Sequence, residues 1–423
     1  MEKLGVEVML YENLSTVINA EIFMQSLGHY FSQMSANKVI VGIMVIFMMV
    51  GGIDKIRGNK KGYGEKFDKG FLTLGPLTIA MLGIITLAPV LNILLEPILR
   101  PVFGLIGADP SIFAGMILGS DMGGYSLAMQ LAESPSAGYF SGLIVASMMG
   151  DVIVFTIPVA LNIIEKEDRI YLSLGVLIGI VTIPIGCIFG GIMMNFTACK
   201  ISFIALILNT IPVFILAGAI TMGLWFFTEK MMDGFLAFGK GINTLITFGT
   251  VIAVSQYLTG IRLPLFYIMV EPDEQGVVPL ENGIMIVGTI ALVLIGAFPM
   301  MLFIEKTFSN RLTKMGNYFK IDKVSVAGIA ANLTNNILVF QLLKDMNGKG
   351  KLLNCAFAVS ASFVFGDHLG FTASVNHEMI LPMIVGKLTA GISAFAVANA
   401  YGEKLLQLGN GKNKGIGKKL EES

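Results

Sequence analysis

Long apolar segments follow one another along most of the chain. A helix that crosses a bilayer needs about 17–25 predominantly apolar residues. Nine segments come close to or exceed that length, near 38–53, 71–95, 139–164, 170–193, 203–227, 241–270, 283–305, 324–343 and 382–401. The pattern therefore predicts an all-α polytopic membrane protein.

Two further apolar segments are interrupted by Gly, Pro and Asp. They cover residues 97–133 and 352–381. Broken helices of this kind are tolerated at membrane depth where they are buried in protein or line a cavity. We expect each of these two segments to be a re-entrant hairpin, for a reason that comes from the loop charges.

The loop charges predict an orientation, because Lys and Arg collect on the cytoplasmic side. The loop 54–70 holds six of them, and the loop 306–323 and the tail from 402 hold five each. These three regions lie on one side of the membrane only if each interrupted segment enters and leaves through the same face. The prediction is nine crossings and two hairpins, with the amino terminus outside and the carboxyl terminus inside.

This topology divides the chain into three parts. They are an amino-terminal extension at 1–37, a transmembrane domain at 38–401 and a basic cytoplasmic tail at 402–423. Since Lys344, Lys349 and Lys351 fall on the outer side, the charge pattern has an exception.

Composition agrees with the membrane assignment. Hydrophobic residues make up 54% of the 423 residues and charged residues only 14%, whereas a soluble domain has about a quarter charged. A net charge of zero argues against nucleic acid as a partner. Three Cys and three His at scattered positions predict no disulfide framework, no metal site and no cofactor.

Both interrupted segments contain a similar short motif. "SDMGGYSLA" at 120–128 and "GDHLGFTAS" at 366–374 align on their Asp residues. The matched pairs are Asp121 and Asp367, Gly124 and Gly370, Tyr125 and Phe371, and Ser126 and Thr372. We interpret this as an internal repeat with units near 71–164 and 324–401. The topology above makes the two copies parallel.

The repeated residues suggest a cation site. An ionised Asp at the bilayer centre costs about 2.5–3.5 kcal/mol on insertion scales, so it faces a partner or water. A cation satisfies the carboxylate, an aromatic ring adds a cation–π interaction, and Ser or Thr bonds a hydroxyl. Glycines let the backbone approach a ligand. Together these residues predict a pocket for a small amine that carries an alcohol.

Structural explanations stay open for the same residues. Each Asp could pair with Lys387 or cap a helix break, and the two aromatic residues could simply pack. Further polar residues within or beside the spans could serve coupling, line the cavity or hold helices together: Asp151, Asn332, Asn335, Asn336 and His368.

Several segments resemble a known family. "GADPSIFAGMILGSDMGGYSLAMQLA" (107–132), "FVFGDHLGFTASVN" (363–376), "PMIVGKLTAG" (382–391) and "GGIDKIRGNKKGYGEKFDKGF" (51–71) are similar to the bacterial ethanolamine permeases. The resemblance runs from about residue 38 to the end of the last span. It implies a protein of the cytoplasmic membrane that takes up ethanolamine for breakdown inside a bacterial microcompartment.

The resemblance and the residues lead to one hypothesis. Asp121 and Asp367 hold the ammonium of ethanolamine in a shared cavity, and a proton, a sodium ion or Lys387 neutralises the spare charge. The hypothesis does not choose between coupled and passive transport or between a monomer and a homo-oligomer in the lipid membrane.

Other functions remain as alternatives. One is a carrier for another small organic cation or solute. A channel would need a continuous polar lining, whereas the polar residues here cluster at two breaks. An intramembrane aspartyl protease would need a Gly where Val364 stands and a later PAL motif, and neither is present.

Overall fold

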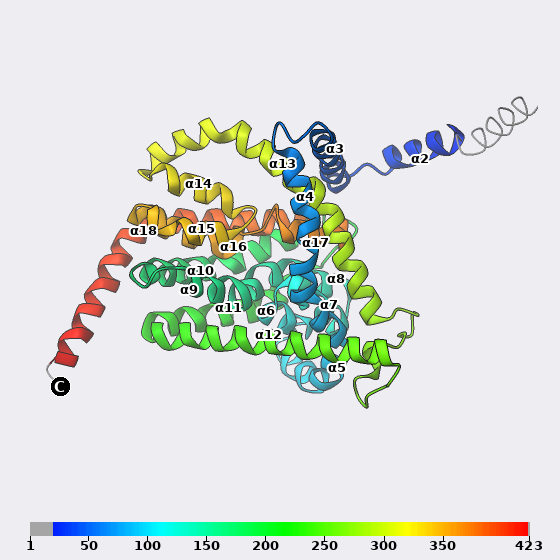
Figure 1. Cartoon of the computed structure of the whole chain (residues 1–423). Helices are drawn as coiled ribbons and strands as arrows, with labels where there is room; N and C mark the ends of the chain where they lie inside the picture. The colour runs from blue at the N-terminus through cyan, green and yellow to red at the C-terminus, as the bar shows by residue number, and fades with distance from the viewer. Residues whose placement is uncertain (1–19, 422–423) are drawn as a thin grey trace, which may run out of the picture.

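The computed structural model describes residues 20–421, and all regular structure within them is helical (Figure 1). Eight segments are long and apolar enough to cross a membrane: Ala36–Ile56, Tyr63–Gly104, Pro135–Ile163, Lys166–Met194, Phe203–Phe226, Thr228–Thr259, Pro279–Thr307 and His377–Gln407. The all-α polytopic prediction is confirmed. Of the predicted extension and tail, residues 1–19 and 422–423 lie outside the described residues.

The helices have the following bounds: α2 Ala20–Ser32, α3 Ala36–Ile56, α4 Tyr63–Leu72, α5 Leu74–Gly104, α6 Ser111–Ile117, η1 Ser120–Met122, α7 Gly124–Leu131, α8 Pro135–Tyr139, η2 Phe140–Gly150, η3 Val152–Thr156, α9 Ile157–Ile163, η4 Lys166–Asp168, α10 Arg169–Met194, α11 Phe203–Phe226, α12 Thr228–Thr259, η5 Tyr267–Met269, α13 Pro279–Phe319, α14 Lys323–Asn332, α15 Asn336–Leu342, η6 Leu343–Asp345, α16 Gly348–Ala361, α17 Asp367–Val375, η7 His377–Met379 and α18 Ile380–Glu421. The segments η2 and η3 are π-helical.

One predicted span ends early. The sequence predicts a helix over 241–270, but α12 stops at Thr259 because Gly260 adopts a left-handed conformation with a φ of 73°. Only glycine adopts that conformation without strain, which makes it a common helix terminator. Pro264 therefore lies in the following loop and not within a helix.

The first interrupted segment is a re-entrant hairpin, as predicted. Helices α6 and α7 form its two arms, and its ends meet at Asp109. The Asp109 carboxylate accepts the backbone N–H of Ser111 at 2.9 Å and that of Glu133 at 3.0 Å. The chain therefore returns to the place where it entered. We call residues 109–133 hairpin 1.

The second hairpin is not where the sequence predicts it. Residues 324–343 were expected to form a span, but the helix breaks between α14 and α15. The Asp322 carboxylate accepts the N–H of Ser325 at 2.8 Å and that of Asn347 at 2.6 Å. This segment also returns to its entrance, and we call residues 322–347 hairpin 2.

The other interrupted segment, 352–381, belongs to a crossing helix. Helix α16 runs along α18 in the opposite direction, since a Cβ on Gly402 would contact Leu352 and one on Gly391 would contact Ala361, and α17 follows α16 in the chain. The pair is thus one discontinuous crossing, broken at residues 362–366. With this crossing added to the eight continuous segments, the total within the described residues is the predicted nine. Segment 352–381 is a crossing instead of a hairpin, and segment 324–343 is a hairpin instead of a crossing.

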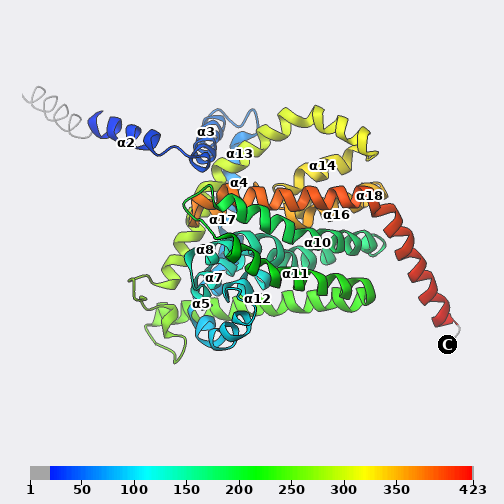
Figure 2. The same ribbon diagram turned by 180° about the vertical axis from the view of Figure 1, so that it is seen from behind.

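The central helices show that the two hairpins enter from opposite ends of the bundle. Helix α10 is antiparallel to α18, with Gly186 against Gly386 and Gly190 against Pro382. Figure 2 shows α10 and α18 lying along each other.

The helix that follows each hairpin fixes the end at which the hairpin enters. The segment 135–163 is antiparallel to α10, because Gly186 faces Met148 and Gly190 faces Ile144. Helix α16 is parallel to α10, because Gly175 faces Cys355 and Gly179 faces Val359. Each hairpin precedes one of these two helices, so their entrances lie at opposite ends. The same-side arrangement expected from the sequence is thereby corrected.

This correction also removes the exception in the charge pattern. Lys344 lies at the closing end of hairpin 2, and Lys349 and Lys351 follow it, so all three lie at the same end as the basic loop 306–323. Lys351 forms an ion pair at 2.6 Å with Asp168, which connects the loop before α10 to that end.

Candidate functional site

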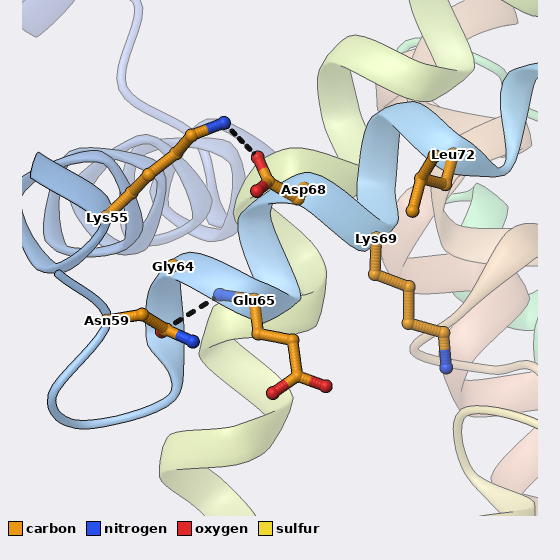
Figure 3. A pocket seen from close by; sticks show the side chains of 7 residues that line it. All are labelled: Lys55, Asn59, Gly64, Glu65, Asp68, Lys69 and Leu72. Carbon is orange, nitrogen blue, oxygen red and sulfur yellow. Dashed lines mark hydrogen bonds and ion pairs between the residues drawn. The ribbon is translucent and has the colours of Figure 1, made fainter.

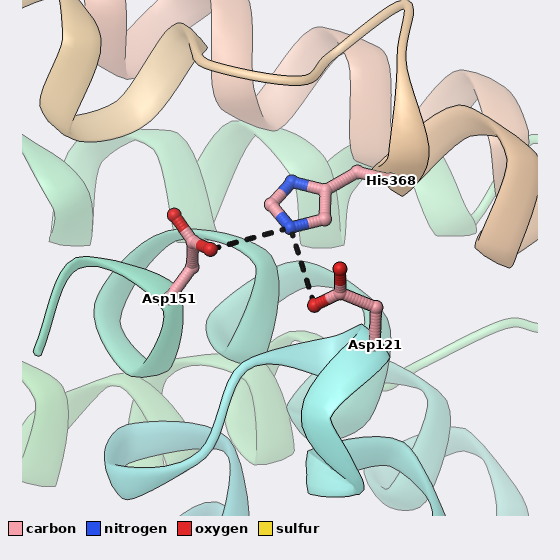
Figure 4. Close-up of side chains that lie close together, drawn as sticks. All are labelled: Asp121, Asp151 and His368. Carbon is pink, nitrogen blue, oxygen red and sulfur yellow. Dashed lines mark ion pairs between the residues drawn. The ribbon is translucent and has the colours of Figure 1, made fainter. Parts of the chain in front are cut away.

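Two carboxylates and an imidazole meet inside the bundle (Figure 4). Nε2 of His368 lies 3.8 Å from Oδ1 of Asp121 and 3.6 Å from Oδ1 of Asp151. His368 and Asp151 are only 1% and 3% exposed. These residues come from three separate elements: η1, the junction of η2 with η3, and α17. We call them the central cluster.

The tip of hairpin 1 holds Asp121 in the cluster. Gly123 ends η1 with a φ of 84°, a left-handed conformation that lets the chain turn into α7. The tip also lies against the next helix, since a Cβ on Gly150 would come within 1.9 Å of the Leu118 carbonyl oxygen. Glycine at this position allows the tip to reach Asp151.

A π-helix presents Asp151 together with a threonine. The Thr156 hydroxyl donates to Oδ2 of Asp151 at 3.0 Å. Residues five apart point in different directions on an α-helix, whereas the i→i+5 bonding of a π-helix brings them together. Nδ2 of Asn336, at the tip of hairpin 2, donates to the Thr156 hydroxyl at 3.0 Å. The tips of both hairpins therefore contact the residues around Asp151.

A buried lysine lies close to the cluster. Lys387 on α18 is 1% exposed, and its ammonium donates to the carbonyl oxygen of Ser147 in η2. Asp151 and Asp121 are the carboxylates that attract it electrostatically. Since a buried charge is costly without a partner of opposite sign, Lys387 balances part of the negative charge of the cluster.

Several polar atoms at the cluster lack a hydrogen-bond partner within the described residues. They are Oγ of Ser120, Oδ1 of Asp121, Oδ1 of Asn336 and both ring nitrogens of His368. Buried polar atoms are nearly always bonded, so each exception calls for an explanation. Unpaired acceptor oxygens on Asp121 and Asn336 are suited to a small ligand with N–H and O–H donors.

The predicted aromatic pair is present. The rings of Tyr125 and Phe371 meet edge to face, with centroids 5.7 Å apart. Phe363 packs against His368 in the same way at 5.6 Å, and its φ of 61° is unusual for a residue with a side chain. Its N–H donates to the carbonyl oxygen of Asn332, which holds the helix break against hairpin 2.

Other predicted residues lie near the cluster but serve the fold. Gly370 packs against Leu294 of α13, and Gly124 lies within the tight turn at Leu118 and Gly119. Asn335 caps α15 by accepting the N–H of Ile337 at 2.8 Å.

The remaining predicted residues are beside the cluster. Thr372 is buried on α17, and Ser126 is half-buried on α7. Asp367 is adjacent to His368 in sequence, but it is not one of the three clustered residues.

The cluster has the spacing that a bound cation needs. One oxygen or nitrogen from each of its three residues lies within 4.8 Å of the others. Carboxylate oxygens accept hydrogen bonds from an organic ammonium as well as they bind an inorganic ion. We treat the three residues as a charge cluster.

A separate hollow of about 430 Å³ lies at the turn between α3 and α4 (Figure 3). Lys55, Asp68 and Lys69 are among its lining residues, and Lys55 forms an ion pair with Asp68. Lys69 also interacts electrostatically with Asp367.

Comparison with known proteins identifies the family. Residues 36–401 match the family described as "Ethanolamine utilisation protein, EutH". The chain belongs to this family. A "Probable ethanolamine permease EutH" of Listeria monocytogenes is 49% identical over 90% of this chain and 98% of its own length. The protein of that name from Salmonella typhimurium is 44% identical over 86% of this chain and 95% of its own length.

An "Uncharacterized protein YxeR" of Bacillus subtilis is also 44% identical, over 86% of this chain and 95% of its own length. No solved structure matches the chain. Since the named relatives are permeases, the family consists of transporters and not enzymes. The protein is therefore a multi-pass protein of a bacterial membrane, and the intramembrane protease alternative is excluded.

Sequence reasoning missed two residues of this site. Thr156 could not be assigned to Asp151 because the π-helix is not visible in a pattern with α-helical spacing. Phe363 gave no signal because its strained conformation depends on contact with hairpin 2.

Proposed function

We propose that this protein carries ethanolamine, as the ammonium cation, across the bacterial cytoplasmic membrane. The observation that supports this most directly is the central cluster, in which the buried Asp151 and the half-buried Asp121 both face His368 in a chain related to named ethanolamine permeases. The cation is the dominant form at neutral pH, because an alkylammonium resembles the Lys head group in its pKa.

In this proposal each part of the substrate has its own partner. Asp121 and Asp151 attract the ammonium, and the Tyr125 and Phe371 rings shield it from water. Oδ1 of Asn336, which has no hydrogen-bond partner, accepts the hydroxyl hydrogen. This differs from the sequence hypothesis, which paired Asp121 with Asp367.

The hairpins offer a way to open the site to one side at a time. Their tips meet near the cluster, and their entrances lie at opposite ends of the bundle. Movement of one tip away from the cluster exposes it to one side while the other tip keeps it closed. Many carriers place their substrate at such a meeting point of broken helices.

The orientation is part of the proposal. The end that carries the loop 54–70, Lys344, Lys349 and Lys351 is placed in the cytoplasm by the positive-inside rule. The carboxyl terminus is then inside and the amino terminus outside.

Uptake of labelled ethanolamine into proteoliposomes tests the function. At about pH 6 little neutral amine is present to leak through lipid. We expect saturable uptake of ethanolamine by the native protein. Asp121→Asn should lower it at least about 100-fold, because leaving a buried charge such as the bound ammonium without its partner costs about 3–5 kcal/mol. Glu133→Gln, which changes an exposed carboxylate of the same hairpin, should leave uptake unchanged.

Competition separates this function from its alternatives. Uptake that is inhibited more strongly by choline than by unlabelled ethanolamine indicates a carrier for another organic cation. Uptake that does not saturate indicates a channel.

A further inference from the structure

The charges around His368 leave a deficit of one positive charge. The central cluster contains two carboxylates, Asp121 and Asp151, and the buried ammonium of Lys387 lies close to them. On the next shell, Asp367 interacts electrostatically with Lys69, which is exposed on α4. With a neutral His368, Asp121, Asp151 and Lys387 together carry a formal charge of −1.

The position of His368 allows it to supply the missing charge. Its Nε2 faces both carboxylates, and neither of its nitrogens has a hydrogen-bond partner within the described residues. A protonated imidazole donates from both nitrogens, and histidine is the side chain that gains or loses this charge near neutral pH. One added positive charge balances the site, whether it belongs to His368 or to a bound ammonium.

We propose that His368 and the substrate ammonium replace one another as the balancing cation, so that one proton leaves for each ethanolammonium that enters the site. This inference rests on the proposed function and specifies its coupling. When the cation binds, the imidazolium releases its proton to water on that side. When the cation leaves on the opposite side, His368 takes up a proton there.

The net movement follows from these two steps. One ethanolammonium crosses in one direction and one proton in the other, and the site is formally neutral in both crossings. A neutral site avoids the cost of moving an unbalanced charge through a low-dielectric interior. Transport is therefore electroneutral, and it does not respond directly to the membrane potential.

The first test uses the native protein in proteoliposomes with an imposed potassium diffusion potential. The initial rate of saturable ethanolamine uptake should be the same with and without an interior-negative potential. Carriage of the cation alone would be accelerated by that potential, and such a result would overturn the exchange.

The second test compares net uptake with exchange in the His368→Gln variant. Without a titratable group at position 368, the empty site keeps its charge of −1. The empty carrier then changes slowly back to the conformation that is open to the side of uptake. We expect net uptake to fall at least about tenfold, because the unbalanced buried charge slows that return. Exchange of labelled internal for unlabelled external ethanolamine should stay within about twofold, since the loaded site is neutral without His368.

Two controls make the outcomes distinct. His377→Gln changes a histidine whose side chain is 52% exposed and should leave both rates unchanged. Loss of net uptake and exchange together, with native thermal stability, would contradict the proposal by showing that His368 is needed to bind the substrate. Absence of saturable uptake and exchange in the native protein would instead refute the proposed function itself.

Discussion

The two hairpins are closed in the same way and differ at their tips. At each entrance an Asp bonds to a nearby N–H and to the N–H of a residue that follows the returning arm. The tip of hairpin 1 carries a carboxylate, Asp121, whereas the tip of hairpin 2 carries a neutral amide, Asn336. The shared entrances serve the fold, and in the proposed function the different tips divide the recognition of an ammonium from that of a hydroxyl.

The first prediction concerns the sides at which the hairpins enter, and its effect is all or none. In a chain without Cys187, Cys199 and Cys355, single substitutions Glu133→Cys and Lys344→Cys place thiols at the two entrances. A membrane-impermeant maleimide should label the first only from outside and the second only from the cytoplasm.

Lys320→Cys is the matched control for this experiment, because it lies before hairpin 2. It should be labelled from the same side as Lys344→Cys. Labelling of these two variants from opposite sides would show that residues 324–343 cross the membrane.

The second prediction concerns the tip of hairpin 2. Asn336→Ala should raise the KM for ethanolamine about fivefold, because one hydrogen bond contributes about 1 kcal/mol. The inhibition constant of ethylamine, which has no hydroxyl, should stay unchanged. Equal weakening of both amines would mean that Asn336 supports the Thr156 to Asp151 contact and does not bind the hydroxyl.

The third prediction concerns the entrance of hairpin 2 and has the smallest effect. Burial acts to raise the pKa of Asp322, but the N–H groups of Asn347 and Ser325 hold that pKa below its ordinary value of 3.8. The ionised carboxylate therefore stabilises the fold above pH 3.8, and this contribution is lost as the pH falls through the lowered pKa.

Asp322→Asn should accordingly lower the free energy of unfolding by about 1 kcal/mol at neutral pH, which is typical of hydrogen bonds to a partly exposed charge. Thermal unfolding in detergent measures the change, and the difference from the native protein should shrink in acid. Asp345→Asn, an exposed acid nearby, is the control. A difference that is constant with pH would mean that the charge of Asp322 is unimportant.

The sequence was sufficient to predict most of the spans and to single out Asp121, because apolar length and a charge within an apolar segment are local signals. It could not show which segment turns back. Residues 324–343 are as apolar as a span, and their break at Leu333, Thr334 and Asn335 contains neither Gly nor Pro. Only the hydrogen bonds of Asp322 to a residue after the returning arm distinguish a hairpin from a crossing.

The composition of the site was predicted only in part. Asp151, Asn336, His368 and Lys387 were named as polar residues within or beside the spans, but the sequence hypothesis paired Asp121 with Asp367, whereas the structure groups Asp121 with Asp151 and His368. The motif similarity favoured Asp367, whereas the meeting of three distant elements decides which carboxylate faces Asp121. The proposed internal repeat stays a hypothesis, and the hairpins suggest an inverted relation between its halves.

A structure of the protein with ethanolamine bound tests the account most directly. Electron cryomicroscopy in lipid nanodiscs should show the ligand between the two hairpin tips. Its nitrogen is expected within hydrogen-bond distance of Asp121 or Asp151, and its oxygen beside Asn336. Ligand density in the hollow between α3 and α4, with none at the central cluster, would contradict the proposed site.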